Sequence, residues 1–190
     1  IQLKVFIKLM KKLIFYWCPH IDYNVATCKA VINSAYSFKK YSKEFEPVII
    51  NSFGEWNYFK KEIYDKNIKI ENISNIKLKL PIHGFLKSRL FYVIFSLISI
   101  FPLLNLIKKK KPDIVMIHLI TIPVLFIAKF FNLKTKFILR ISGFPKLNFF
   151  RKTVWKFLST NLSVIFSPTL VTKEMLDETK IFKTVPIKVL

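Results

Sequence analysis

The chain has 190 residues, of which 52% are hydrophobic and 16% aromatic, and it carries 32 lysine and arginine residues against 11 aspartate and glutamate residues. This composition excludes a disordered chain and is sufficient for one well-packed domain. The formal net charge of +21 predicts attraction to anions such as nucleic acid, anionic lipid or phosphorylated substrates, although an AT-rich coding sequence also raises the lysine content without selection for a partner.

The amino-terminal end contains a natural start. Met10 begins the stretch MKKLIFYWC, so we expect residues 1–9 to be a non-native upstream segment and the domain to cover residues 10–190. A signal peptide is not predicted, because the run lacks a small-residue cleavage site. Cys18 and Cys28 are the two cysteines, and no cluster of metal-ligating residue types surrounds them. We therefore expect two small core residues, no metal, no cofactor and a reduced compartment.

Six short runs are continuously apolar, which is typical of parallel strands buried on both faces. Four segments between them have apolar residues three or four apart and predict helices, the first of them capped by Asp22 or Asn24. Strand and helix in alternation predict an α/β fold, a Rossmann-like parallel sheet with helices on both faces. The predicted strands are 13–17, 47–51, 113–117, 136–141, 163–167 and 187–190, and the predicted helices are 24–45, 122–132, 151–161 and 169–179.

One segment, residues 89–111, differs from the rest because it holds about 18 nearly uncharged residues, the lower limit for crossing a bilayer. We expect a helix that covers the sheet and dips into a membrane interface, with Lys108, Lys109, Lys110 and Lys111 contacting anionic headgroups. A purely buried helix is the alternative. A different class of protein also stays open, a small noncatalytic membrane-associated protein whose hydrophobic helix at 90–107 spans the bilayer.

Several chemistries are excluded by what the sequence lacks. The three glycines, Gly54, Gly84 and Gly143, are dispersed, so neither a dinucleotide fingerprint nor a P-loop is present. No GxSxG elbow occurs, and the three histidines are too far apart for a sequence-local triad or zinc motif. The lysines accompany no RNP pattern and no helix-turn-helix, so we expect no nucleic acid as a partner.

The stretches CPHIDYNVAT, PVIINSFGEW, KKPDIVMIHLIT, ILRISGFPKLNFFRKTVWK and VIFSPTLVTKEML occur in this order from Met10 onward. Their order resembles the amino-terminal half of retaining glycosyltransferases with the GT-B fold, glycosyltransferase family 4, of the type that builds bacterial surface polysaccharides. The resemblance implies an acceptor-binding Rossmann domain. It also implies that the donor-binding domain is absent from this chain, which ends near the expected crossover, so we expect the chain to be inactive alone.

The resemblance further implies a hexosyltransferase activity in cell-surface polysaccharide biosynthesis, with a nucleotide-sugar donor and a lipid-linked or saccharide acceptor. It implies a cytoplasmic, peripheral location on the inner face of the cytoplasmic membrane. In the loop after the first strand the family often has two glycines, which this chain lacks. His20, Asp22 and Asn24 are therefore expected to bind sugar hydroxyls rather than phosphate.

Two residues are the catalytic candidates. The family commonly places two histidines, two residues apart, after the strand that begins with PD. Here Met116 replaces the first and His118 remains, expected to hydrogen-bond near the reacting atoms; the alternative is a ring satisfied by backbone carbonyls. A departing nucleotide diphosphate needs a cation, and Arg140 is expected to supply it, unless it forms a salt bridge with an acid such as Asp113.

The remaining substrate-binding candidates lie after other strands. The ISG turn resembles the family turn that carries a glycine at the cleft, which implies binding roles for Ser142 and Gly143, with Lys146 nearby. Glu55, next to Trp56, follows the second strand, where an acid and an aromatic ring can bracket a sugar. A turn packed against the sheet edge is the alternative for this pair.

Overall fold

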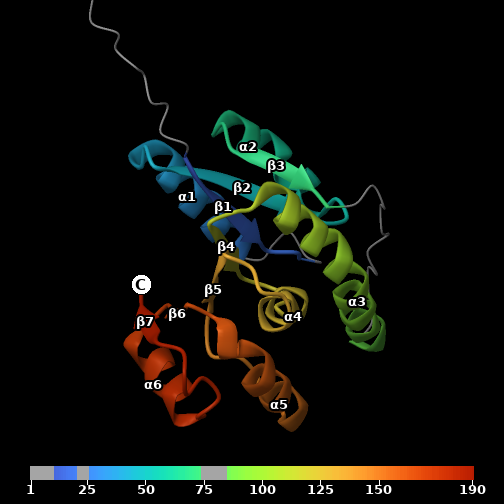
Figure 1. Cartoon of the computed structure of the whole chain (residues 1–190), viewed down its shortest axis with the longest axis vertical. Helices are drawn as coiled ribbons and strands as arrows, with labels where there is room; N and C mark the ends of the chain where they lie inside the picture. The colour runs from blue at the N-terminus through green and yellow to red at the C-terminus, as the bar shows by residue number, and fades with distance from the viewer. Residues whose placement is uncertain (1–10, 21–25, 74–84) are drawn as a thin grey trace, which may run out of the picture.

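The protein, as a computed structural model, is described over residues 11–20, 26–73 and 85–190. Its centre is a seven-stranded parallel sheet with the strand order β3-β2-β1-β4-β5-β6-β7 (Figure 1). The strands are β1 Lys12–Trp17, β2 Phe45–Asn51, β3 Lys69–Asn72, β4 Ile114–Ile117, β5 Lys136–Arg140, β6 Val164–Ser167 and β7 Ile187–Val189.

All six predicted strands are confirmed to within two residues, because each is an apolar run that the sheet buries. The sequence did not indicate β3, whose four residues read KIEN and whose central residues are only half-buried. It lies at the edge of the sheet beside β2. A short edge strand with two charged residues lacks the continuous apolar signal of the interior strands.

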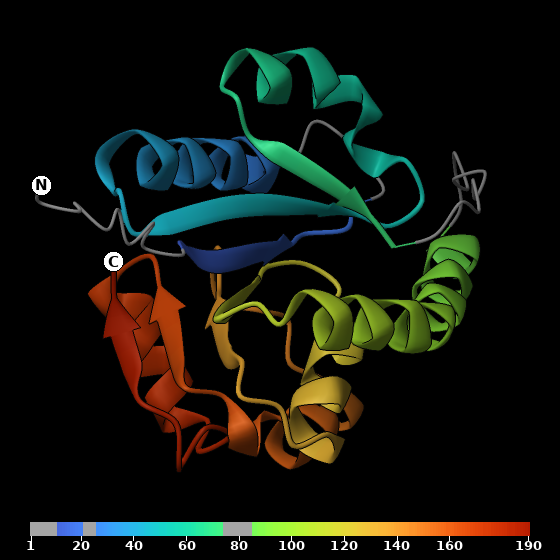
Figure 2. The same cartoon turned by 45° about the horizontal axis from the view of Figure 1, so that its top comes forward.

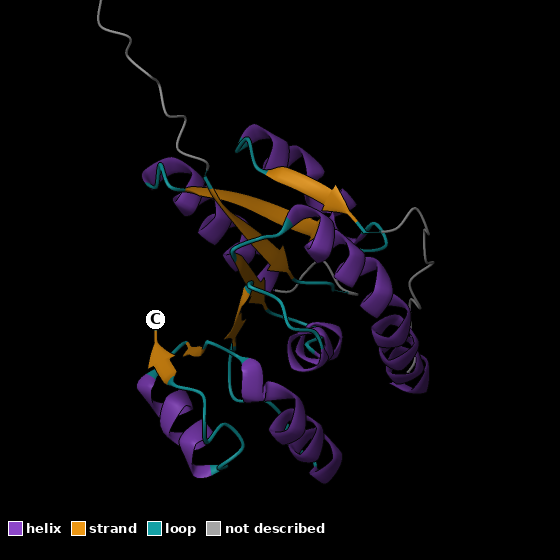
Figure 3. Cartoon of the chain, in the orientation of Figure 1, coloured by secondary structure: helices purple, strands orange, loops and turns teal. Residues whose placement is uncertain are grey.

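Helices fill the connections between the strands (Figure 3). The predicted helices are confirmed. Side-chain caps form at the start of two of them: Asn148 accepts a hydrogen bond from the backbone N–H of Arg151, and Thr169 accepts one from the backbone N–H of Thr172. The sequence missed α2 and the 3-10 turn before it. The helices are α1 Ala26–Tyr41, α2 Lys60–Asp65, α3 Phe85–Lys110, α4 Ile122–Phe130, α5 Phe149–Leu158 and α6 Leu170–Glu178, with 3-10 turns η1 Glu55–Phe59 and η2 Ser159–Asn161.

The helices form two layers around the sheet, with α1 and α2 on one side and α3, α4, α5 and α6 on the other (Figure 2). Alternate residues of each strand serve the two layers. In β1, Ile14 and Tyr16 belong to the cluster with α1, while Phe15 and Trp17 belong to the larger cluster with α3 and α4. The predicted sheet with helices on both faces is therefore confirmed.

Helix α3 has one buried face and one exposed face. Phe95, Leu103, Leu104 and Ile107 are almost fully buried against the sheet layer. The opposite face, which we call the outer α3 stripe, consists of the exposed residues Leu90, Val93, Ile94, Leu97, Ile98 and Phe101. By length and composition residues Leu90–Lys110 are able to cross a membrane, and 44% of the most apolar window is buried inside the protein. Helix α3 thus covers the sheet as predicted, and it is not purely buried.

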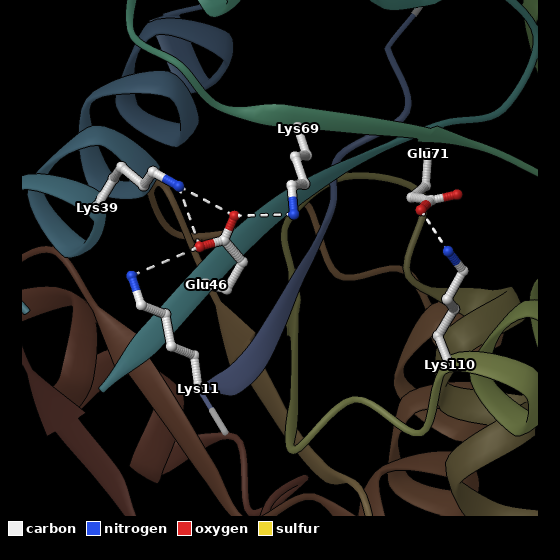
Figure 4. A network of polar contacts seen from close by, with 6 residues as sticks. All are labelled: Lys11, Lys39, Glu46, Lys69, Glu71 and Lys110. Carbon is white, nitrogen blue, oxygen red and sulfur yellow. Dashed lines mark hydrogen bonds and ion pairs between the residues drawn. The ribbon is translucent and has the colours of Figure 1, made fainter. Parts of the chain in front are cut away.

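One carboxylate pairs with several lysines at the amino end of β2, on the side of the sheet opposite the carboxyl ends of the strands. Glu46, at the start of β2, lies within salt-bridge distance of Lys11, Lys39 and Lys69 (Figure 4). Burial alone would raise the pKa of Glu46, but Lys39 and Lys69 outweigh it, and the pKa is lowered. With so few acids engaged in such pairs, much of the excess positive charge is left without a carboxylate partner.

Candidate functional site

The strand order places the reversal of the sheet between β1 and β4, which are neighbours although β2 and β3 separate them in sequence. In sheets of this kind, ligands bind beyond the carboxyl ends of the strands at that point. His20 follows β1 and His118 follows β4, so both histidines lie at the carboxyl ends beside the reversal. The candidate site is therefore built from loops that the sheet itself holds in register.

His118 is buried, with 6% of its surface exposed. Its backbone N–H donates to the carbonyl of Trp17 at 2.9 Å, and its ring stacks on that of Tyr16 with the centroids 6.2 Å apart. Neither ring nitrogen has a hydrogen-bond partner within the described part of the chain. No backbone carbonyl of the described residues accepts a hydrogen bond from the ring, so the alternative of a histidine satisfied by backbone carbonyls is wrong. Both ring nitrogens can therefore form a hydrogen bond with a ligand.

Burial, and secondarily the charge of Arg140, lowers the pKa of His118 to about 3. The imidazole is accordingly neutral near pH 7, with one nitrogen that donates and one that accepts. A neutral ring of this kind positions a hydroxyl group by hydrogen bonding and carries no charge to a phosphate.

We expect acid to destabilise the wild-type protein more than a His118→Gln variant. The pKa of His118 is about 3 in the folded protein against an ordinary value of 6.5, so the unfolded state binds more protons between these values. The stability contributed by the neutral ring is present above pH 6.5 and is lost as the pH falls toward 3. At pH 4.5, about two units below the ordinary value, the difference between the two proteins should be about 2–3 kcal/mol.

The measurement is urea denaturation of both proteins at pH 7 and pH 4.5. Because the substitution also changes packing, the relevant quantity is the pH-dependent change in the free energy of unfolding of each protein, not its absolute value. An equal acid-induced loss in both proteins would show that the ring of His118 is not buried as a neutral group.

Arg140 ends β5, the neighbour of β4, and is half-buried. It forms no ion pair with any described carboxylate. The salt bridge to Asp113 is wrong for a topological reason: Asp113 precedes β4, at the opposite end of the parallel sheet, where its Oδ2 accepts the backbone N–H of Leu13 at 2.7 Å. The guanidinium therefore remains available to an anion.

His118, Arg140, Ser142 and Gly143 line one pocket of about 180 Å³. The loop after β5 is tied to α1 by a hydrogen bond between the hydroxyls of Ser142 and Thr27, 3.0 Å apart. A side chain at position 143 would meet nothing within 4 Å, so packing does not require glycine there. The structure thus brings together both catalytic candidates and two predicted binding residues, whereas Lys146 lines the hollows next to this pocket.

Glu55 and His20 belong to a separate cluster beyond β1 and β2. The Glu55 carboxylate accepts the backbone N–H groups of Ser52 and Phe53 at 2.9–3.0 Å, and Gly54 supplies the positive φ of 102° that the turn requires. Burial raises the pKa of Glu55, against the effect of these N–H groups. The structure gives Glu55 the turn-packing role that was the alternative, since its oxygens are already engaged.

The His20 ring lies edge-on to Trp56, with centroids 4.8 Å apart, and its Nδ1 is 3.0 Å from the carbonyl oxygen of Cys18. Its Nε2 has no partner within the described ranges. Burial lowers the pKa of His20, but contacts with Cys28 and Cys18 outweigh this and raise it. Both cysteines are buried and unpaired, as core residues. The predicted binding residues Asp22 and Asn24, and the predicted cap, lie outside the described residues.

Several other residues of the pocket were not indicated as candidates by the sequence. Tyr92 comes from α3, Arg151 and Trp155 come from α5, and Ile120 comes from the turn after β4. Ile120 has a φ of 45°, which a β-branched residue rarely adopts, and its carbonyl accepts the indole N–H of Trp17 at 2.9 Å. A strained turn beside the pocket is held in place by a buried tryptophan.

Three of the predicted membrane lysines, Lys108, Lys109 and Lys110, lie in the last turn of α3, and Lys111 directly follows the helix. Lys110 forms an ion pair with Glu71 at 2.6 Å (Figure 4), and the ammonium of Lys108 lies 5.4 Å from the centre of the Phe131 ring. Lys109 and Lys111 are exposed and have no side-chain partner among the described residues. Two of the four ammonium groups therefore have contacts within the protein, and two are fully available.

The seven-stranded parallel sheet, with a pocket at the carboxyl ends of β4 and β5 beside its reversal, defines a Rossmann-like α/β domain. Among solved structures, the chain is similar to a glycosyltransferase from Rickettsia africae, with 18% identity and a TM-score of 0.62 over 95% of this chain and 42% of that one. It is also similar to the UDP-GlcNAc 2-epimerase from Neisseria meningitidis bound to UDP-GlcNAc, with 15% identity and a TM-score of 0.59 over 94% and 45%.

A third similar structure is MurG from Acinetobacter baumannii, with 14% identity and a TM-score of 0.53 over 85% of this chain and 42% of that one. The chain thus spans less than half the length of these structures. No protein-family model and no curated protein matches the chain. At these identities the likeness establishes the fold, and the predicted fold class, a Rossmann-like domain of the GT-B type, is confirmed.

Proposed function

We propose that the chain is the acceptor-binding domain of a glycosyltransferase of the retaining GT-B type, family 4, that moves a sugar from a nucleotide-sugar donor to a lipid-linked or saccharide acceptor in cell-surface polysaccharide biosynthesis. The observation that carries the proposal is the shared pocket of Arg140 and His118, which has a cation without a described carboxylate partner and a neutral ring without a described hydrogen-bond partner. The likeness to glycosyltransferase structures supports it.

The residues of the pocket suit the two demands of the reaction. The departing nucleotide diphosphate accumulates negative charge, which the guanidinium of Arg140 stabilises. The neutral ring of His118 hydrogen-bonds a hydroxyl of the acceptor or of the transferred sugar and holds it in position, and Ser142 adds a hydroxyl at the rim. Neither role requires His118 to remove a proton.

In this proposal the nucleotide sugar is held mainly by a second domain, so the 190-residue chain alone is inactive. The least demanding experiment reads the coding sequence that follows Leu190. A second alternation of strands and helices, with two glutamates spaced across a helix start, is the expected result. A coding sequence that stops there without such a domain would contradict the two-domain proposal.

We also propose that the domain is peripheral on the inner face of the cytoplasmic membrane. The outer α3 stripe presents six apolar residues along the helix that the lysines Lys108–Lys111 terminate. Apolar side chains beside ammonium groups suit an interface that contains anionic lipids. The packing of α3 disfavours the alternative of a noncatalytic protein whose helix at 90–107 spans the bilayer. A spanning α3 would have to leave the sheet and expose its buried face to lipid.

Replacing Lys109 and Lys111 together by glutamine should weaken binding to phosphatidylglycerol vesicles at least tenfold, because each lysine near an anionic surface contributes about 1 kcal/mol. Among Lys108–Lys111, these are the two lysines without a side-chain partner in the described part of the chain. The matched control replaces Lys183, which precedes β7, and Lys188, which lies in β7; both are exposed. Vesicle co-sedimentation measures the binding of both double variants. An equal loss of binding in the control would mean that the net charge, and not the position of Lys109 and Lys111, determines binding, and would contradict the proposal.

A further inference from the structure

A second and larger hollow, which we call the α3–α5 groove, adjoins the pocket of His118. It has a volume of about 700 Å³ and is lined from α3 by Tyr92 and Val93 and from α5 by Phe150, Val154 and Trp155. Tyr92, Arg151 and Trp155 line the groove and the pocket alike. The two hollows are therefore neighbours with a common wall, and the smaller one holds the polar side chains of His118 and Arg140.

Cations without carboxylate partners stand at the junction. The Nη1 of Arg151 donates to the carbonyl of Lys146 at 3.2 Å, and its guanidinium lies 5.3 Å from the centre of the Trp155 ring. These two contacts hold the guanidinium at the common wall. Arg140 lines the pocket and Lys146 lines the groove. No described aspartate or glutamate lines either hollow, and no ion pair engages these three cations within the described ranges.

The groove also reaches the outer α3 stripe, the side that we propose lies on the membrane. Val93 belongs both to its lining and to the outer α3 stripe, and the exposed Phe149 and Phe150 lie at the start of α5. An apolar chain can therefore run from the exposed stripe into the groove and end at the cations. A saccharide would find few hydrogen-bonding groups on these walls, since ligand sites match apolar walls with apolar ligands.

We propose that the α3–α5 groove binds the hydrocarbon chain of a lipid diphosphate acceptor, whose diphosphate lies at Arg151 and Lys146, while Arg140 remains for the departing nucleotide diphosphate. The guanidinium of Arg151 suits a diphosphate because it presents several donors in a fixed plane, and the ammonium of Lys146 adds a second positive charge. In such an acceptor, the group to be glycosylated is attached to the diphosphate and would extend into the neighbouring pocket. The ring of His118, whose nitrogens have no described partner and which is 6% exposed, lies in that pocket. This inference rests on the proposed function and selects the lipid-linked class of acceptor.

The test uses the 190-residue chain, farnesyl diphosphate as the probe and no membrane. Isothermal titration calorimetry should show saturable binding, at least tenfold tighter than that of inorganic pyrophosphate or UDP. Trp155 lines the groove, whereas Trp17 and Trp56 are buried in the sheet core. Binding should therefore change the tryptophan fluorescence, and a Trp155→Phe variant should lose that change.

Two variants separate the headgroup from the chain. Arg151→Gln should weaken farnesyl diphosphate binding at least tenfold, whereas Lys156→Gln, an exposed cation of the same helix that lines neither hollow, should not. Val93→Asp should weaken it similarly, whereas Val171→Asp, on α6 and also more than half exposed, should leave it unchanged. Because Val93 is 54% exposed, its substitution leaves the fold intact.

Three outcomes would overturn the inference: pyrophosphate or UDP binding as tightly as the lipid, control variants losing as much as Arg151→Gln and Val93→Asp, or an excess of phosphatidylglycerol vesicles displacing the probe as an equal competitor. The assay contains no nucleotide sugar, so it is independent of transfer. Transfer to a water-soluble saccharide without farnesyl diphosphate binding would overturn the inference and leave the proposed function standing. Lipid binding without any transfer would do the reverse.

Discussion

Leu103→Ala should lower the free energy of unfolding by about 2–5 kcal/mol. Leu103 is 1% exposed on the inner face of α3 and belongs to the main core cluster. Its truncation removes buried methyl groups and leaves a cavity between α3 and the sheet. Leu97→Ala is the matched control, because Leu97 lies on the same helix with 62% exposure, and it should change the stability by less than about 0.5 kcal/mol.

Urea denaturation in the absence of lipid measures both variants. Equal, small effects of the two substitutions would mean that α3 does not pack against the sheet in solution, and the spanning alternative at 90–107 would then be favoured. The result also bears on the site, because α3 carries Tyr92 to the wall that separates the pocket from the α3–α5 groove.

Arg140→Gln should lower kcat/KM for sugar transfer about 100-fold in a polypeptide that joins this domain to its donor-binding domain. Removing one group that stabilises the charge of a transition state typically costs about 2.7–4 kcal/mol, and Arg140 is the cation nearest the end of β5 in the pocket. Arg140→Lys should recover part of the loss, because it restores the charge without the planar fork of donors.

The control for Arg140 is Lys136→Gln, an exposed cation at the other end of the same strand. It changes the net charge equally and leaves the pocket untouched, so its kcat/KM should match that of the wild type. Full activity of Arg140→Gln, or an equal loss in Lys136→Gln, would remove Arg140 from the catalytic machinery.

The architecture could be predicted from the sequence because burial on both faces leaves a mark in each strand. LIFYW, DIVMI and KFILRI are apolar at every position that the two helical layers cover, and no such mark exists in KIEN, which forms the edge strand β3. The 3-10 turn and α2 after β2 were missed for a related reason. Both elements are short, and the turn before them is held by a local contact that has no sequence pattern: the Glu55 carboxylate accepts the backbone N–H groups of Ser52 and Phe53.

The candidate site was predictable only in the part that the strands position. His118 and Arg140 end neighbouring strands, so the strand-end rule brings them together. The parallel topology also separates Arg140 from Asp113. Asp113 lies before its strand and Arg140 lies at the end of the neighbouring strand, so the order of the sequence already places the two residues at opposite edges of the sheet. Tyr92, Arg151 and Trp155 reach the pocket through the packing of α3 and α5 against the same sheet face, and no local sequence pattern encodes such contacts between distant helices.

The central claim is that this domain supplies the acceptor half of a nucleotide-sugar glycosyltransferase, and the most direct measurement is sugar transfer itself. A polypeptide that joins the domain to its donor-binding domain is incubated with labelled nucleotide sugars and a lipid diphosphate acceptor, beside the 190-residue chain alone. The account predicts labelled glycolipid from the two-domain polypeptide and none from the isolated chain. Transfer by the isolated chain, or none by the joined domains with any nucleotide sugar, would contradict it.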